Sequence, residues 1–432
     1  MRAVTFIDAE VVPETGKIAD FGAIRSSGEN IHDASLEAIR QFLRESDFLC
    51  GHNIIEHDMK YLDKNIGQFS CAGVIDTLPL SALLFPQRPY HALVKDDKLQ
   101  VDELNNPLND SKKARDLFYD EVETFRSLPD EMKRIYFILL GDKKELRDFF
   151  SYIEYKCDKS LGEIEIREYF HGKICEHADV EKLVSEHGIE LAYCLSLIYA
   201  DDEYSITPPW ILMRYPYVDV VMNKLRGTRC VEGCVFCNEM MDAVRGLKRF
   251  FGYDAYRSFD GVPLQEQAVK AAVDGDSLLA VFPTGGGKSI TFQVPALMAG
   301  KNTKSLTVVI SPLQSLMKDQ VDNLERGSIT DAVTINGLLD PIERMEAIRR
   351  VESGEAHILY ISPESLRSRS IEKILLDRKI ARFVIDEAHC FSAWGQDFRV
   401  DYLYIAEFIK KICEKKNLGY MIPVSCFTAT AK

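Results

Sequence analysis

The feature that most constrains this chain is a glycine-rich turn between an expected strand and an expected helix. Residues 280–289 read Ala-Val-Phe-Pro-Thr-Gly-Gly-Gly-Lys-Ser. The apolar run 278–282 is typical of a buried parallel strand, and residues 290–297 continue with helical apolar spacing. Glycines at such a turn let several backbone N–H groups point inward, where the positive end of the following helix also attracts anions. The stretch therefore predicts a P-loop that binds nucleotide phosphates, rather than a glycine-rich turn that binds nothing.

The polar residues around this loop have distinct expected tasks. Lys288 is expected to neutralise the β and γ phosphates, and Ser289 to place its hydroxyl on Mg²⁺. Phe282 stands where the general pattern has its first glycine, a departure that many helicase-type loops share. Upstream, Gln265 offers an amide donor and acceptor to the edge of adenine. The predicted nucleotide-binding residues are Gln265, Thr284, Gly285, Gly286, Gly287, Lys288 and Ser289.

Length and composition limit the class of protein. At 432 residues the chain is expected to form two or three domains, since one domain takes roughly 150 residues. No apolar run approaches the roughly 18 residues of a membrane span, and the early Asp8 argues against a signal peptide, so we expect a cytoplasmic protein without membrane contact. The eleven cysteines favour reduced thiols with a metal site. A net charge of −14 restricts any nucleic-acid contact to a local patch.

Further strands follow the P-loop, and one ends in an acidic pair. Residues 306–310 and 357–361 are expected strands that end in Ser-Pro turns, and residues 381–385 form a third. The third strand places Asp386 and Glu387 at its carboxyl end, where open α/β sheets bind ligands. Asp386 is expected to hold Mg²⁺, and Glu387 to polarise the water that attacks the γ phosphorus. The predicted catalytic residues are Lys288, Asp386, Glu387 and His389, in a RecA-like nucleoside-triphosphatase sheet.

From about residue 250 to its end, the chain resembles the first RecA-like domain of a RecQ-family ATP-dependent DNA helicase. Besides the P-loop and the Asp-Glu-Ala-His box, residues 390–399 resemble the aromatic-rich loop of that family, with glutamine at 396 where the family usually has histidine. The resemblance implies that Trp394, Phe398 and Arg399 contact single-stranded DNA by stacking and charge. Residues 427–431 resemble the motif that links hydrolysis to DNA movement. The family needs a second RecA-like domain, which does not follow Lys432, so we expect a longer natural chain.

The first 120 residues carry a different set of carboxylates. Asp8 and Glu10 lie two apart at the end of an expected strand and therefore share one face. Asp58 and Asp110 each stand near the start of an expected helix. In this order the four acids resemble the DEDD (DnaQ-like) exonucleases, which implies an RNase H-like fold. It also implies that the acids hold two Mg²⁺ or Mn²⁺ ions, which activate a water and stabilise the leaving oxygen of a phosphodiester.

This sequence departs from both branches of that family at the general base. Asn105 stands where one branch has histidine, and Asn106 where the other has tyrosine. Asparagine does not accept the proton of a water at neutral pH, and loss of a general base costs about 10²–10⁴ in rate. His91 is a candidate substitute, although no spacing places it at the metals. A slow or metal-activated exonuclease and a nuclease-shaped domain that binds without cutting both remain open.

The segment between these two regions has helical apolar spacing and one cysteine cluster. Cys230, Cys234 and Cys237, around a glycine turn, are spaced to converge on one Zn²⁺, with Cys175 or His177 as a candidate fourth ligand. The alternative is three thiols that bind no metal.

Together these features predict an α/β protein with a DnaQ-like domain over 1–120, a mainly helical connector over 121–245 and a RecA-like domain over 246–432. The expected function is a 3′-to-5′ DNA helicase or translocase that uses ATP and Mg²⁺, with an attached exonuclease-like domain. Its expected partner is single-stranded or partly duplex DNA. The alternative function is a DNA-binding scaffold that does not cut and that ATP switches between conformations.

Overall fold

A computed structural model describes most of the chain, as two compact units. The described residues are 2–12, 14–67, 71–88, 90–93, 106–160, 162–202, 204–283, 285–391 and 399–429. The units are Met1–Tyr169 and Phe170–Lys432. In the described residues, no helix has the length and apolar character of a membrane span.

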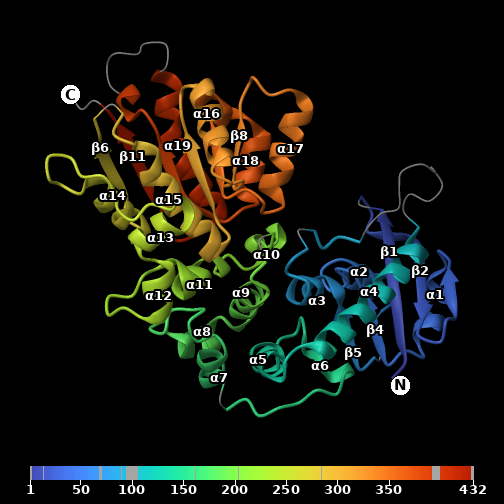
Figure 1. Cartoon of the computed structure of the whole chain (residues 1–432). Coiled ribbons are helices and arrows are strands. Elements are labelled where there is room, and N and C mark those ends of the chain that lie inside the picture. The colour runs from blue at the N-terminus through green and yellow to red at the C-terminus, as the bar shows by residue number, and fades with distance from the viewer. Residues whose placement is uncertain are drawn as a thin grey trace. The chain divides into compact units, whose positions relative to one another are not determined.

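The first unit is built on a mixed five-stranded sheet in the order β3-β2-β1-β4-β5 (Figure 1). β1 pairs antiparallel with β2 and parallel with β4; β2 and β3 are antiparallel, and β4 and β5 parallel. Its strands are β1 (Val4–Val12), β2 (Lys17–Arg25), β3 (Asn30–His32), β4 (Phe48–Gly51) and β5 (Gly73–Asp76). Its helices are α1 (Leu36–Leu43), α2 (Asp58–Ile66), α3 (Thr77–Leu84), α4 (Pro107–Ser127), α5 (Asp130–Leu140), α6 (Arg147–Tyr152) and α7 (Gly162–Tyr169).

Alternation along β1 places helices on both faces of this sheet. Phe6 and Ile7 are both buried and point to opposite faces, because successive side chains of a strand alternate. The Phe6 ring lies 5.6 Å from that of Phe118 on α4. Ile7 instead joins the cluster that contains Ile39 of α1 and Leu62 of α2. The central strand is therefore covered on both sides, which fixes the position of its carboxyl end.

Gly22 brings the start of α4 onto the sheet. It pairs with Asp8 in the β1–β2 register. A Cβ atom at residue 22 would lie only 2.0 Å from the backbone nitrogen of Leu108, so only glycine allows this approach. The Ser111 hydroxyl donates to the Gly22 carbonyl at 2.7 Å. The first turn of α4, which carries Asp110, therefore lies beside the carboxyl end of β1.

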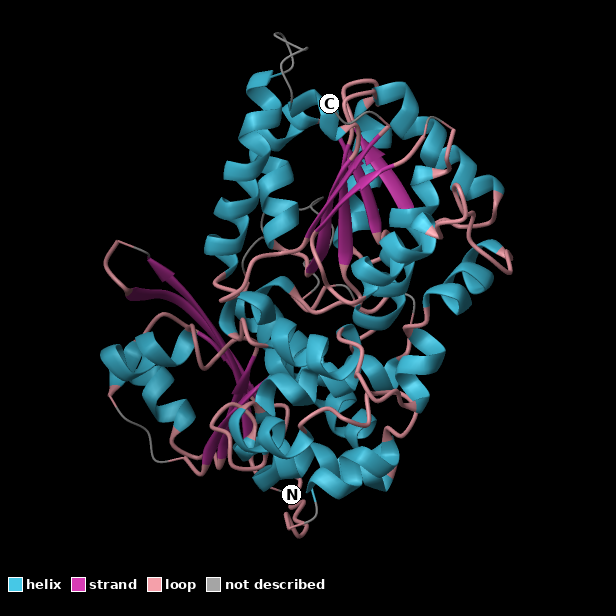
Figure 2. Ribbon diagram, turned by 90° about the vertical axis from the view of Figure 1, so that its left-hand side faces the viewer, coloured by secondary structure: helices cyan, strands magenta, loops and turns pink. Residues whose placement is uncertain are grey.

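The second unit contains a six-stranded, all-parallel sheet in the order β6-β11-β10-β7-β9-β8. Figure 2 shows helices on both of its faces. The strands are β6 (Leu278–Val281), β7 (Leu306–Ile310), β8 (Ala332–Ile335), β9 (Ile358–Ile361), β10 (Ile380–Ile385) and β11 (Val424–Thr428). The helices around the sheet are α14 (Leu264–Val273), α15 (Lys288–Thr303), α16 (Gln314–Arg326), α17 (Pro341–Glu352), α18 (Arg369–Leu376) and α19 (Arg399–Lys416).

Two apolar cores lie on opposite faces of this parallel sheet. Adjacent residues of β7 point to different cores: Val308 packs with residues of α17, α18 and α19, and Val309 with residues of α15 and α16. Strands buried on both faces read as nearly continuous apolar runs, as Leu306–Ile310 does apart from Thr307. The predicted α/β class, with a parallel RecA-like sheet in the C-terminal part, is confirmed.

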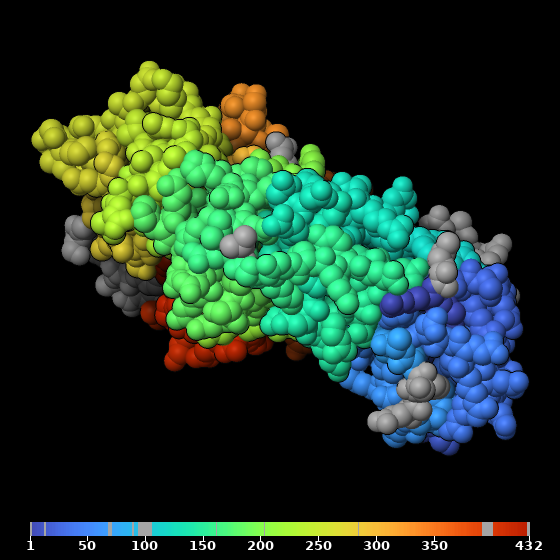
Figure 3. All heavy atoms as spheres, turned by 90° about the horizontal axis from the view of Figure 1, so that it is seen from below, coloured from blue at the N-terminus to red at the C-terminus, as the bar shows by residue number. Residues whose placement is uncertain are grey.

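Helices that precede this sheet belong to the same unit. They are α8 (Val180–Glu186), α9 (Gly188–Ala200), α10 (Pro209–Arg214), α11 (Val218–Met222), the π-helical turn Asn223–Gly227, α12 (Val235–Met240) and α13 (Ala243–Phe251). Within this unit, the chain from about residue 210 to residue 260 forms a continuous yellow-green to yellow surface (Figure 3). The Lys379 ammonium, just before β10, donates to the Asp219 carbonyl at 3.1 Å and lies 3.7 Å from an Asp219 carboxylate oxygen. Both side chains are almost fully buried, with exposed fractions of 5% and 4%.

The compact units do not coincide with the three predicted segments. Helix α4 runs continuously through residue 120 and packs on β1 through Phe118, so the first unit extends to residue 169. Helix α13 spans residue 245 and packs against α15, where Gly246 closely approaches the Met298 side chain. The segment 121–245 is thus divided between the two units, because α4 packs on the first sheet and α13 packs on α15 of the second unit.

Glu121 of α4 is a buried carboxyl in the first unit, and its ionisation links the stability of this unit to pH. Its carboxyl is fully buried, and neither oxygen has a hydrogen-bond partner among the described residues. Burial, followed by the charge of Asp76, raises its pKa well above the ordinary value. The folded chain therefore holds this proton more tightly than the unfolded chain, and the free energy of unfolding falls as pH rises above the ordinary carboxyl range.

We expect Glu121→Gln to reduce this fall in stability between about pH 5 and about pH 8, because an amide carries no charge to bury. Denaturant unfolding at several pH values measures it. Glu123→Gln, an exposed position on the same helix, is the matched control and should leave the pH dependence unchanged. Equal pH profiles for wild type and Glu121→Gln would contradict the prediction.

Candidate functional site

The glycine-rich turn follows β6, and α15 begins within it. Phe282 is buried and lies near the rings of Phe259 and Phe427, at 6.0 and 6.3 Å between centroids. An aromatic residue therefore replaces the first glycine of the general pattern, because this position faces the core under the loop. Gly285 and Gly287 have φ angles of +75° and +68°, which favour glycine. The turn opens directly into α15 at Lys288.

Lys288 reaches the acidic pair at the end of β10, across the intervening strand β11. Its Nζ lies 2.5 Å from Glu387 Oε1 and 3.5 Å from Asp386 Oδ1. Burial opposes the charged ammonium, but the hydrogen bond to Glu387 and the charge of Asp386 outweigh it, so the pKa of Lys288 is raised. Burial raises the pKa of the Asp386 carboxyl, against the charge of Lys288. The structure thus brings together three predicted catalytic residues.

His389 connects the acidic pair to the end of β11. Its Nδ1 lies 3.1 Å from Glu387 Oε2 and 3.2 Å from the Thr428 hydroxyl. Glu387 has a φ of +51°, a conformation that non-glycine residues seldom adopt and that places its carboxyl between Lys288 and His389. The residues predicted at three separate points of the sequence therefore form one polar cluster at the carboxyl edge of the sheet.

Gln265 holds the glycine-rich turn in place. Its amide nitrogen donates to the carbonyls of Gly286 and Gly287 at 2.9 and 3.2 Å, and its amide oxygen accepts from the backbone N–H of Arg257 at 2.9 Å. The side chain is almost fully buried. The predicted adenine contact stays a prediction, and the bonds to the turn are a role that the sequence did not indicate.

A pocket of about 670 Å³ lies beside the turn and is lined by Gln265, Gly287 and Ser289. Its other walls come from the loop after α13, including Tyr253 and Tyr256, and from α16. Its volume lies in the range of small-molecule sites. The tyrosines and the α16 residues were not predicted as site residues, because only the tertiary fold brings them to the turn.

Several predicted residues lie outside the described part of the chain. These are Thr284 of the glycine-rich turn, Asn105 of the first segment, and Trp394 and Phe398 of the aromatic-rich loop. The backbone of Arg399 begins α19, and its side chain is also outside the description. Their predicted tasks stay predictions.

In the first unit, the four predicted acids lie near one another. Burial, followed by the charges of Asp58, Asp110 and Glu10, raises the pKa of Asp8 to about 8. Asp58 Oδ1 accepts a hydrogen bond from the Ala9 N–H at 2.9 Å, which attaches the start of α2 to β1. Among the described residues, no three of these carboxylates bring oxygens within 4.8 Å of one another. Asp8 and Glu10 of β1 thus form an acidic cluster with Asp58 and Asp110, which lie at the starts of α2 and α4. This cluster is wider than a site in which three carboxylates surround one ion.

His91, the candidate substitute for a general base, and Asn106, which stands where one branch has tyrosine, both make other contacts. His91 is buried, and its Nδ1 lies 2.9 Å from the Ser81 hydroxyl of α3. Burial, followed by the charge of Arg88, lowers the pKa of His91 to about 4. The Asn106 side chain caps α4 by accepting from the N–H groups of Leu108 and Asn109. Among the described residues, no contact places His91 in the acidic cluster.

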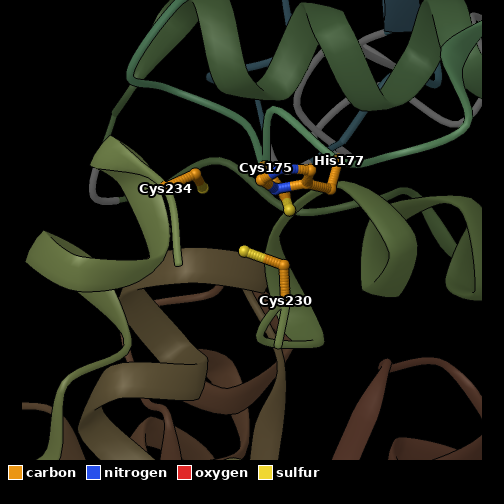
Figure 4. Close-up of side chains that lie close together, drawn as sticks. All are labelled: Cys175, His177, Cys230 and Cys234. Carbon is orange, nitrogen blue, oxygen red and sulfur yellow. The ribbon is translucent and has the colours of Figure 1, made fainter. Parts of the chain in front are cut away.

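The cysteine cluster of the second unit gathers residues from two stretches. Ligand atoms of Cys175, His177, Cys230 and Cys234 all lie within 4.8 Å of one another (Figure 4). Cys237, the third predicted ligand, is fully buried in α12 and contacts the thiols of Cys230 and Cys234. The structure therefore brings both candidate fourth ligands to the predicted trio.

Comparisons with known proteins find similarity to helicases. Residues 262–432 match the family model described as DEAD/DEAH box helicase. The chain is 36% identical over 193 residues to the ATP-dependent DNA helicase RecQ of Haemophilus influenzae, covering 45% of this chain and 28% of the relative. It is 36% identical over 185 residues to the probable ATP-dependent DNA helicase RecS of Bacillus subtilis, covering 43% and 34%.

Among solved structures, the DUF1998 helicase MrfA matches with 20% identity and a TM-score of 0.35, over 45% of this chain and 29% of that one. The chain spans about a third or less of the length of the curated relatives named above. The stretch that matches the family model contains the glycine-rich turn, the acidic pair and all six strands of the parallel sheet. Residues 262–432 are therefore similar in sequence to the DEAD/DEAH box helicases.

Gly287 offers a test of the turn geometry. We expect Gly287→Ala to weaken binding of a fluorescent ATP analogue by at least about tenfold. The positive φ costs roughly 1–2 kcal/mol for an alanine, and the new methyl would lie 2.8 Å from the Gln265 amide nitrogen. Equilibrium fluorescence titration measures the affinity, and thermal unfolding reports the fold.

Gly275→Ala is the matched control, because Gly275 also has a positive φ, +88°, but has no atom within 4 Å of the added methyl and lies outside the pocket. It should cost similar stability and leave the affinity unchanged. Equal affinities for the two variants would show that the turn does not hold the nucleotide.

Proposed function

We propose that the second unit binds and hydrolyses ATP as the first motor domain of a RecQ-type DNA helicase or translocase that moves 3′ to 5′ on single-stranded DNA. The observation that carries the proposal is the contact of Lys288 with Asp386 and Glu387 at the carboxyl edge of the parallel sheet. The sequence similarity to RecQ helicases supports the choice among motor families. Movement along DNA and its direction rest on that similarity.

The oxygen atoms gathered at this site fit a Mg²⁺ ion. Two carboxylates and the hydroxyl of Ser289 are oxygen ligands, which Mg²⁺ prefers. We expect Ser289 and Asp386 to hold Mg²⁺ beside the phosphates, and when bound this ion neutralises charge that develops on the phosphoryl oxygens. In the structure, Lys288 neutralises the same two carboxylates. One positive charge thus already faces the two acids, and Mg²⁺ would add the further positive charge that they can accommodate.

Binding of a triphosphate would redistribute these charges. The Lys288 ammonium would exchange its contact with Glu387 for the phosphates, which present more negative charge than one carboxylate. Glu387, then free of Lys288, would orient the attacking water, while His389 keeps its contacts with Glu387 and Thr428. Thr428 is the last residue of β11. Through His389, its hydroxyl therefore connects the Glu387 carboxyl to the segment that follows this strand.

We expect Lys288→Ala to lower DNA-stimulated ATP hydrolysis by at least about 10²-fold, because the phosphates lose their nearest cation. Glu387→Gln should keep ATP binding and lose hydrolysis to a similar extent. A coupled phosphate-release assay with and without single-stranded DNA measures both. Lys301→Ala, in the last turn of the same helix, is the control and should match wild type.

ATP hydrolysis that single-stranded DNA does not stimulate would contradict the motor proposal. It would favour the alternative of a DNA-binding scaffold that ATP switches between conformations.

For the first unit we propose a metal-dependent 3′-to-5′ exonuclease-like activity. The mutual influence of Asp8, Glu10, Asp58 and Asp110 supports it, because carboxylates held close together by the fold offer the oxygen ligands that Mg²⁺ and Mn²⁺ take. The mixed sheet supports it too, since β1, α2 and α4 each deliver a member of the cluster. With asparagine at 105, we expect a rate about 10²–10⁴ below that of enzymes with a general base.

We expect slow shortening of a 5′-labelled single strand from its 3′ end in Mn²⁺, lowered at least about 10²-fold by Asp8→Ala. Denaturing gel electrophoresis resolves the products. Glu37→Ala, an exposed acid on α1, is the control and should not change the rate. Strands that are bound but stay at full length in every divalent metal would show that this unit grips DNA without cutting it.

A further inference from the structure

Four buried or half-buried thiols meet at one point of the second unit. Cys175, Cys230 and Cys234 have sulfur atoms within 4.8 Å of one another. The Cys237 thiol contacts those of Cys230 and Cys234, and the Cys175 thiol contacts those of Cys230 and Cys237. Figure 4 shows Cys175, Cys230 and Cys234 pointing toward a common centre from separate segments. All four are free thiols.

The backbone at this point has features that prepare the thiols for a ligand. Gly233 has a φ of +79°, which turns the chain between Cys230 and Cys234. The Cys237 N–H donates to Cys234 Sγ at 3.4 Å, a bond that stabilises negative charge on this sulfur. The Cys175 N–H donates to the carbonyl of Leu225 at 2.8 Å, which fixes the distant fourth thiol beside the others.

We propose that Cys175, Cys230, Cys234 and Cys237 bind one structural Zn²⁺ through four thiolates. With Zn–S bonds of about 2.3 Å, the sulfurs of a tetrahedral site lie ~3.8 Å apart. The sulfurs of Cys175, Cys230 and Cys234 already lie within 4.8 Å of one another, and the Cys237 thiol contacts those of Cys175, Cys230 and Cys234. A cluster of several irons would hold its thiolates farther apart than a single ion. The site has no open position, as is usual for zinc that stabilises a fold.

His177 is the competing fourth ligand, because its ring also lies within 4.8 Å of three of the sulfurs. However, its Nε2 lies 2.7 Å from Glu232 Oε2, and both side chains are exposed, at 42% and 74%. Cys237 is fully buried. A thiolate without solvent needs a compensating charge more than a solvated imidazole does, which favours Cys237 as the ligand and His177 as a neighbour at the rim.

The ion would brace helices beside the nucleotide pocket. The end of α12 is attached to α15 by the Asn302 side chain, which donates to the Met240 carbonyl at 3.1 Å. Glu239 of α12 forms ion pairs with Arg245 and Arg249 of α13. Helix α13 in turn supplies Leu247 to the wall of the pocket. Zinc would therefore fix α12, whose side chains and backbone contact α13 and α15 beside this wall.

Metal analysis of the whole purified chain tests the proposal. We expect about one zinc ion per chain and no stoichiometric iron. Serine at any of the positions 175, 230, 234 or 237 should reduce the zinc content severalfold or more, whereas His177→Asn and the control Cys157→Ser should retain it. Release of zinc by a thiol reagent should lower the thermal unfolding temperature of the wild type.

Cobalt substitution of the wild type keeps the test valid if a serine variant does not fold. The absorption of the Co²⁺ protein should show tetrahedral geometry and sulfur charge transfer of four thiolates. A spectrum with three thiolates, or zinc lost in His177→Asn but kept in Cys237→Ser, would overturn the ligand assignment. Protein purified without zinc, or with iron and a visible cluster spectrum, would overturn the proposal itself.

Discussion

The candidate catalytic centre depends on one charge balance, that of Lys288 with Asp386 and Glu387. Two carboxylates at the buried edge of a sheet repel each other and lose solvation, and burial accordingly raises the pKa of Asp386. The ammonium offsets this cost because β6 and β10 end at the same edge of an all-parallel sheet. The same attraction brings the lysine proposed to bind phosphates and the acids proposed to act in hydrolysis into one site, so the fold and the proposed chemistry rely on the same contact.

Basic residues around the start of β10 hold that strand in position. Arg378 is fully buried and donates to the carbonyls of Val351 and Lys304. Arg382 donates to the carbonyls of Ala272 and Asp276. Burial lowers the pKa of each guanidinium to about 10, so both remain charged at neutral pH. Carbonyl groups from several elements thus fix the strand that delivers the acidic pair.

Local motifs made the centre of the second unit predictable, whereas contacts between distant segments were not. The glycine-rich turn and the acidic pair each carry their chemistry within a few residues, and the parallel sheet was confirmed. The tasks of Gln265 toward the turn and of His389 toward Thr428 depend on side-chain directions that only packing sets. The division of residues 121–245 between two units also depends on packing. In the first unit, the resemblance to DEDD exonucleases predicted which acids gather, but nothing in the sequence indicated that Gly22 allows the helix carrying Asp110 to approach the sheet.

The buried pair of Lys379 and Asp219 has a consequence for dissecting this molecule. Asp219 precedes residues 262–432, the stretch that matches the helicase family model. Its carboxylate nevertheless offsets the positive charge of Lys379 at the start of a core strand. A fragment that began at residue 246 would leave this ammonium without its counter-ion, and removal of one partner of a buried ion pair costs about 3–5 kcal/mol. A fragment designed to keep this ion pair therefore has to include Asp219, as the compact unit that begins at Phe170 does.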